Sequence, residues 1–159
     1  MTSGDFTCGE TVASYPSIVY GAGNGYGSPG TVLPLEVSAL TCVTSSWNVT
    51  TTNTGYWDAA YDIWFCPNKG LSSNSAELMI WMDYMPGTEP AGSLQAANVS
   101  IGGQKWDVYE GNIGWNYIAY LAEPSITAFN NENIYAFIQD SCPAAIFKTP
   151  GTLQTSRQA

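Results

Sequence analysis

One apolar run that carries a single carboxylate, residues 76–82 with the sequence AELMIWM, constrains this chain most strongly. The run is typical of a β-strand, in which successive side chains point to opposite faces. One face then holds Glu77, Met79 and Trp81, and the other holds Leu78, Ile80 and Met82. A carboxylate among apolar neighbours is costly in free energy unless it is paired or used in chemistry. Glu77 is therefore the first candidate for a functional residue.

A second strand of the same character lies upstream, at residues 59–65 with the sequence AAYDIWF. Asp62 and Trp64 share one of its faces, because strand side chains alternate. The loop at residues 66–75 then predicts an antiparallel hairpin with the Glu77 strand. Such a hairpin can place Asp62 beside Glu77 on the same face.

The charge balance and the absence of histidine narrow the possible functions. Four Lys and Arg against thirteen Asp and Glu give a formal charge of −9. This argues against nucleic acid or an anionic membrane as a partner, because both require basic patches. No histidine is present, which excludes His-based triads and most zinc sites, so acid–base chemistry falls to carboxylates and we expect no metal or cofactor. Six Trp and ten Tyr suggest a groove that binds a glycan.

The pattern of elements predicts one all-β domain. The 159 residues, of which 45% are hydrophobic and 11% charged, suit a single globular unit. Many short strands with one helix at 131–142, capped by Asn130 or Asn131, predict an antiparallel β-sandwich of the jelly-roll, concanavalin-like type. The strands are expected within residues 17–20, 31–40, 45–52, 56–65, 76–82, 97–101, 105–110 and 116–121.

Four widely spaced cysteines leave two interpretations open. Cys8, Cys42, Cys66 and Cys142 can form two disulfides in an oxidising compartment, with three possible connectivities, or remain buried free thiols. We expect an extracellular, secreted location, although the opening residues MTSGD do not form a signal peptide. No apolar run approaches the length of a membrane span.

Several segments of the chain resemble glycoside hydrolase family 12. The resemblance covers about residues 13–142, and it rests on the segments ASYPSIVYG, LPLEVSAL, AAYDIWF, AELMIWM, VSIGGQKWDVYEG and YIAYLAEPSI. It implies an endo-β-1,4-glucanase or xyloglucanase on a β-jelly roll with a concave cleft. The implied substrates are cellulose, mixed-linkage glucan or xyloglucan.

The resemblance also implies roles for single residues. Glu77 matches the nucleophile of a retaining mechanism, and Asp62 matches a neighbour that tunes this nucleophile through like-charge coupling and a shared proton. The residues expected to bind substrate or line the site are Trp64, Met79, Trp81 and Pro90, the last in a loop that crosses the cleft. Structural alternatives exist for each of them: packing for the two tryptophans, a hydrogen-bond acceptor for Asp62, and a half-exposed strand residue for Glu77.

The chain departs from the family pattern at both ends. A retaining glycosidase needs a second carboxyl about 5–5.5 Å from the nucleophile, and the family carries it after the helix in a Q-x-G-x-E context. Residues 141–159 contain no Asp or Glu, so no acid/base residue is found, and the family's opening strands should precede Tyr15. Residues 1–159 are therefore expected to form a single, incomplete domain.

Three functional hypotheses follow. The first is an endo-β-1,4-glucanase that uses Glu77. The second is a non-catalytic glycan-binding or decoy paralogue, whose surface could still be recognised by a proteinaceous inhibitor. The third is a truncated product with no function of its own. A missing general acid would cost about 10²–10⁴-fold in rate, so glycan binding would survive its loss better than turnover.

Overall fold

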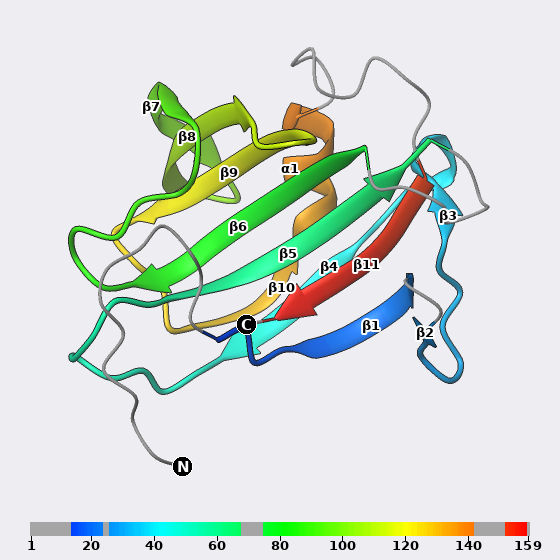
Figure 1. Cartoon of the computed structure of the whole chain (residues 1–159), viewed down its shortest axis with the longest axis horizontal. Helices are drawn as coiled ribbons and strands as arrows, with labels where there is room; N and C mark the ends of the chain where they lie inside the picture. Colours follow the sequence, from blue (N-terminus) through cyan, green and yellow to red (C-terminus); the bar gives the residue numbers. More distant parts are fainter. Residues whose placement is uncertain (1–13, 24–25, 68–74, 142–151, 159) are drawn as a thin grey trace.

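The computed structural model describes residues 14–23, 26–67, 75–141 and 152–158 (Figure 1). Most of the described residues form one nine-stranded sheet, in the order β2-β1-β11-β5-β6-β9-β8-β7, with β3 paired to β11. Its strands are β1 (Ile18–Gly23), β2 (Tyr26–Gly27), β3 (Leu35–Glu36), β5 (Asp58–Cys66), β6 (Ala76–Tyr84), β7 (Ser93–Ile101), β8 (Gln104–Asn112), β9 (Asn116–Glu123) and β11 (Thr152–Gln158). The all-β prediction is thus confirmed.

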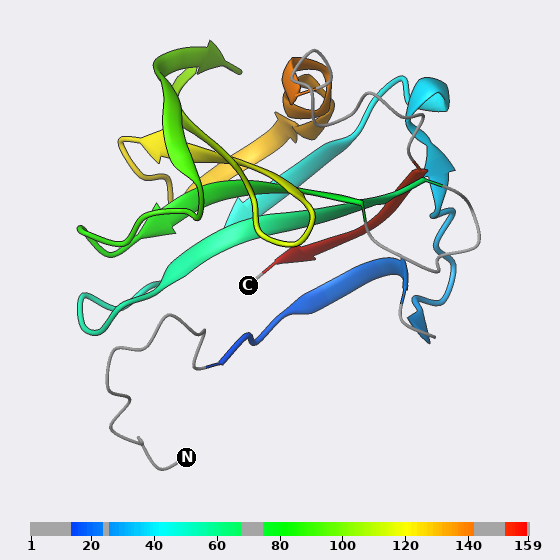
Figure 2. The same ribbon diagram turned by 45° about the horizontal axis from the view of Figure 1, so that its top comes forward.

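A smaller layer packs against one face of this sheet. It consists of β4 (Thr44–Asn48) paired with β10 (Ala128–Asn133), followed by the short helix α1 (Ile134–Ser141). In Figures 1 and 2 these elements lie together on one side of the curved main sheet. The described strands pair antiparallel with one exception, since β6 and β9 run parallel. The antiparallel sandwich predicted from the sequence therefore contains one parallel pair.

The main core lies between the two layers. Trp47 of β4 packs on Tyr61 of β5, with ring centroids 5.2 Å apart. Phe137 of α1 meets Trp106 of β8 edge-on at 4.8 Å and Tyr120 of β9 at 5.2 Å. Edge-to-face pairs at such distances add to the free energy gained by burying the rings. These contacts fix which face of the main sheet is turned towards the smaller layer.

The two long central strands have one face in this core and one face away from it. The core face consists of alternate residues buried in the main cluster, namely Tyr61, Ile63, Phe65, Leu78, Ile80 and Met82. The opposite face, called here the carboxylate face, consists of Ala60, Asp62, Trp64, Glu77, Met79 and Trp81. The alternation read from the sequence is therefore confirmed for both strands.

Several boundaries differ from the prediction because distant segments determine them. The segment at 31–40 forms only the two-residue β3, which runs into a 3-10 turn, η1 (Val37–Ala39). The helix begins at Ile134, because the residues before it pair with β4 as β10. Asn130 and Asn131 therefore lie in a strand and do not cap the helix. The strand β11 was not predicted.

The structure tests one of the two interpretations of the cysteines. Cys42 is an exposed free cysteine, and Cys66 is buried at the end of β5. Cys8 and Cys142 lie outside the described residues. Two disulfides would require all four cysteines, so the two-disulfide interpretation is wrong. Among the described residues, no helix is long and apolar enough to cross a bilayer.

Candidate active site

The β5–β6 register brings the predicted carboxylates onto one face. Trp64 lies opposite Glu77, and Asp62 lies opposite Met79. Directly paired residues share a face, so Asp62 and Glu77 are diagonal neighbours. The prediction that both carboxylates lie on one face is confirmed, with a diagonal relation between them.

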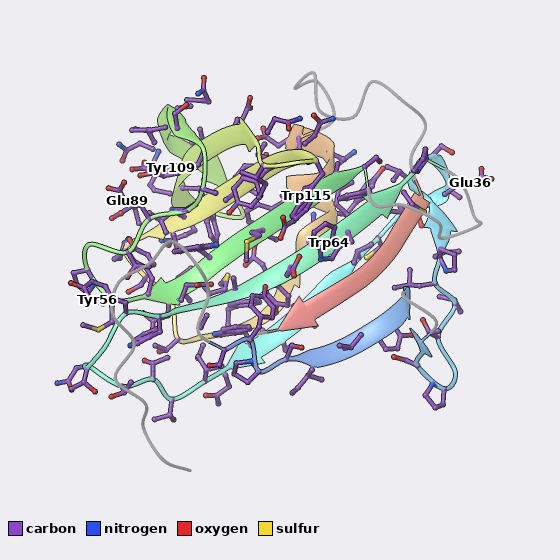
Figure 3. The ribbon with its side chains drawn as sticks, viewed as in Figure 1. Glu36, Tyr56, Trp64, Glu89, Tyr109 and Trp115 are labelled. Carbon is purple, nitrogen blue, oxygen red and sulfur yellow. The ribbon has the colours of Figure 1, made fainter. Side chains whose placement is uncertain are left out.

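Glu77 is almost fully enclosed, with 6% of its surface exposed. Trp115, in the turn between β8 and β9, donates its indole Nε1–H to Glu77 Oε2 at 2.6 Å. The same indole packs on Trp64, with ring centroids 5.1 Å apart and a tilt of 57° (Figure 3). A hydrogen bond from a neutral donor to a carboxylate favours the ionised form. The ionised form is the one that a nucleophile needs.

Asp62 is the more deeply buried of the two, with 2% of its surface exposed. The hydroxyl of Tyr15, which precedes β1, donates to Asp62 Oδ2 at 3.0 Å. Burial and the neighbouring Asp62 charge raise the pKa of Tyr15 well above its usual range. Tyr15 therefore keeps its proton and remains a hydrogen-bond donor, which accounts for part of the compensation that a buried carboxylate requires.

A third carboxyl, Asp58, stands at the start of β5, opposite Tyr84. Burial raises the pKa of Asp58 to about 6, and the charge of Asp62 adds to this effect. Charges on Asp58, Asp62 and Glu77 all raise the pKa of Tyr15. The three carboxyls therefore lie close enough to Tyr15 for the charge of each to affect its pKa.

Met79 and Trp81 form a packed floor beside these groups. The Met79 sulfur accepts a hydrogen bond from Trp81 Nε1 at 3.5 Å and from the Tyr117 hydroxyl at 3.3 Å. Burial, followed by the Glu77 charge, raises the pKa of Tyr117 above its usual range. Both predicted residues are buried in the smaller apolar cluster of the carboxylate face. Their contact with a substrate stays a prediction.

Pro90 is buried in the loop between β6 and β7. Two residues later, Gly92 adopts a positive φ of 87°, and its Cα faces the backbone of β8 so closely that any Cβ would collide with the Glu110 carbonyl. Only glycine fits both the conformation and the close approach. The loop therefore contacts β8 closely at Gly92, two residues after Pro90.

The late strand β11 lies between β1 and β5, with Arg157 opposite Asp62 in the register. Its sequence, TLQTSRQ, contains neither Asp nor Glu. β11 therefore brings no second carboxylate to the sheet. Among the described residues, no cluster of three or more acidic, Cys or His side chains is arranged to hold a metal ion.

Comparison with known proteins now identifies the family. The sequence model described as "Glycosyl hydrolase family 12" matches residues 5–157. The chain belongs to glycosyl hydrolase family 12. It is 34% identical to Endoglucanase S of Pectobacterium parmentieri over 123 residues, which cover 70% of this chain and 46% of that protein. The chain therefore spans about half the length of the curated relatives that it matches.

Solved structures of family 12 members support the same assignment. The endoglucanase cel12A from Rhodothermus marinus matches with a TM-score of 0.89 and 35% identity, covering 95% of this chain and 68% of that one. A family 12 xyloglucanase from Bacillus licheniformis matches with a TM-score of 0.84 and 27% identity, covering 96% of this chain and 69% of that one. The jelly-roll fold class is thus confirmed.

Three contributors to this family 12 site were missed in the sequence. Tyr15 precedes β1 and Trp115 lies in a turn, where no alternation marks a face, and Asp58 is the first residue of β5. The sequence feature that could have pointed to Trp115 is its position in the short glycine-containing segment GNIGW, which is typical of a turn. Large aromatic side chains in such turns are candidates for ligand contact, because loops so often carry function.

Proposed function

We propose that this family 12 chain forms a glycosyl–enzyme ester through Glu77, as a retaining endo-β-1,4-glucanase does. The observation that carries the proposal is the buried Glu77 carboxylate, which accepts a hydrogen bond from Trp115 on the carboxylate face. Glu77 would attack the anomeric carbon, and the leaving-group oxygen would depart with the electron pair of the broken bond and take a proton from water. Water then hydrolyses the ester and releases the sugar.

Asp62 would tune the nucleophile in this mechanism. It shares the face with Glu77 and is held by the Tyr15 hydroxyl. A second buried negative charge nearby makes ionisation of the pair interdependent, as in other coupled carboxyls. The candidate substrates are β-1,4-glucans, since the relatives are named as endoglucanases and xyloglucan-specific glucanases. Trp64, Met79, Trp81 and Pro90 are proposed to support substrate binding.

The size of a polymeric glucan bears on whether the chain acts inside or outside the cell. Such a substrate cannot enter a cell intact, so we propose that the chain works outside the cell.

A second candidate function is glycan binding without turnover. The observation that favours it is the composition of β11, which lies beside β5 and carries no Asp or Glu. Leaving-group protonation by a positioned acid contributes about 10²–10⁴-fold. Without such an acid, the carboxylate face could bind a glucan, or be bound by a proteinaceous inhibitor, with little hydrolysis.

A substrate whose leaving group needs no protonation tests the nucleophile alone, without a general acid. Incubation with 2-deoxy-2-fluoro-β-cellobiosyl fluoride should give a stable ester, because fluoride departs without protonation and the ring fluorine slows hydrolysis. We expect the intact mass to rise by one fluorocellobiosyl group, with the label mapped to Glu77 by peptide mass spectrometry. Glu77→Gln should give no adduct, whereas the matched control Glu36→Gln, at an exposed position on β3, should label like the unchanged chain.

The outcomes discriminate between the two candidates. A label on Glu77 together with release of reducing sugar from soluble β-glucan supports the endoglucanase. Glucan binding with neither label nor sugar release supports the binding protein. A label at another residue contradicts the assignment of Glu77.

A further inference from the structure

The turn between β8 and β9 holds Trp115 in a defined position. Gly114 adopts a positive φ of 103°, and its N–H donates to the Asn112 side chain at 3.2 Å. The N–H of Ile113 donates to the Trp115 carbonyl at 3.1 Å. These internal hydrogen bonds stabilise the turn and therefore fix the position of the Trp115 backbone.

The indole then makes two contacts with strands far away in the sequence. Its Nε1–H donates to Glu77 Oε2 at 2.6 Å, across 38 positions of sequence. Its ring lies against Trp64, which is the residue directly opposite Glu77 in the β5–β6 register. Figure 3 shows Trp64 and Trp115 together over β5 and β6. Trp115 is half-buried, so this hydrogen bond is partly shielded from water.

We propose that Trp115 is a positioning residue, whose indole N–H fixes the orientation of the Glu77 carboxylate while Trp64 fixes the indole. This inference rests on the proposed role of Glu77 as the nucleophile. A carboxylate on a flexible side chain must meet the anomeric carbon in one orientation, and small misplacements are costly in rate. A donor bound to one oxygen restricts rotation of the carboxylate plane and keeps the group ionised.

Trp115→Phe removes the donor and keeps a ring against Trp64. Hydrogen bonds to charged groups contribute enough for a loss of roughly 10-fold to 100-fold in the rate of Glu77 labelling by the fluorinated cellobiosyl fluoride. We expect the concentration that gives half-maximal rate to change little, because the binding surface is retained. The matched control is Trp57→Phe, since Trp57 packs against the main core and not on the carboxylate face.

A measurement that needs no turnover tests the hydrogen bond itself. The chain contains seven Glu, so carboxyl ¹³C labelling of glutamate gives a short spectrum in which Glu77→Gln identifies one signal. The titration midpoint of that signal should move upward in Trp115→Phe and stay in place in Trp57→Phe, because the lost donor favoured the charged form. A purely structural role would change stability and leave the midpoint unmoved.

The unchanged chain provides a second measurement if Trp115→Phe fails to fold. One of the six Trp indole N–H signals should follow the ionisation of Glu77, and this dependence should vanish in Glu77→Gln. An unmoved Glu77 midpoint, an indole spectrum insensitive to Glu77, or a labelling rate within twofold of Trp57→Phe would each overturn the proposal. If the unchanged chain is not labelled at all, the proposed function fails, and the two spectroscopic measurements still decide the role of Trp115.

Discussion

The two faces of β5 and β6 are both buried, yet they are buried in different ways. The core face contains only apolar residues and Tyr61, packed between the sheet and the smaller layer. The carboxylate face holds two almost fully enclosed carboxyls, Asp62 and Glu77, each with a hydrogen-bond donor from a distant segment. A carboxylate can therefore be retained on a buried strand where donors converge on it. Three predictions test this difference.

The largest effect is expected from a carboxylate on the wrong face. Ile80 is fully buried in the main core, between Met79 and Trp81 in sequence but on the opposite face. Ile80→Glu should destabilise the fold by more than about 4 kcal/mol, because the new charge lies among apolar side chains without a partner. Loss of the cooperative unfolding transition in urea at pH 7 would show this. The control Ile80→Val should cost about 1 kcal/mol. Cooperative unfolding of Ile80→Glu would contradict the proposed difference between the core face and the carboxylate face.

A smaller effect is expected when a donor is removed from the carboxylate face. Tyr15→Phe deletes the hydroxyl that donates to Asp62 and should cost about 2 kcal/mol, since a buried carboxylate loses a partner. The free energy of unfolding at pH 7 is the measurement. Tyr20→Phe, at an exposed tyrosine of β1, is the matched control and should be near neutral. Equal stabilities of the two variants would mean that Asp62 does not depend on Tyr15.

The smallest effect concerns Asp58, whose pKa is raised by burial and by Asp62 to about 6. The folded state therefore holds this proton more tightly than the unfolded state, and stability falls as the pH rises from about 4 to about 6. A rise in pKa from 3.8 to about 6 corresponds to about 3 kcal/mol at most. Because Asp58 is only partly buried, solvent screening reduces this, and Asp58→Asn should stabilise the fold by about 1 kcal/mol at pH 8, with little difference at pH 3.

Unfolding curves at the two pH values measure the effect of Asp58→Asn. Glu36→Gln, at an exposed position, serves as the control. A gain that is equal at pH 3 and pH 8 would show that the charge on Asp58 is not its cause.

The sequence predicted the parts of the site that depend on strand periodicity. Asp62, Trp64, Glu77, Met79 and Trp81 were placed on one face because a strand alternates at every residue, and the register confirms that placement. The family resemblance added their proposed roles, which the experiments above test. Pro90 lies in a loop, as its surroundings predicted, although its burial could not be read from its neighbours.

The elements that were missed depend on contacts across long stretches of chain. The strand β10 forms because it pairs with β4, about eighty residues earlier, and its pairing shortens the predicted helix. β11 joins the sheet between β1 and β5, and β6 pairs with β9 in parallel. Local propensity does not reveal such partners, because the hydrogen bonds of a strand are made with another segment.

The sequence by itself determined the fold class, the two faces of the central strands and the position of the lone carboxylates, since each follows from local alternation and composition. The tertiary structure decided what compensates those carboxylates. Tyr15 reaches Asp62 across 47 positions, and Trp115 reaches Glu77 across 38. Hydrogen-bond partners at such separations depend on how the sheet is assembled, and no periodicity in the chain encodes them.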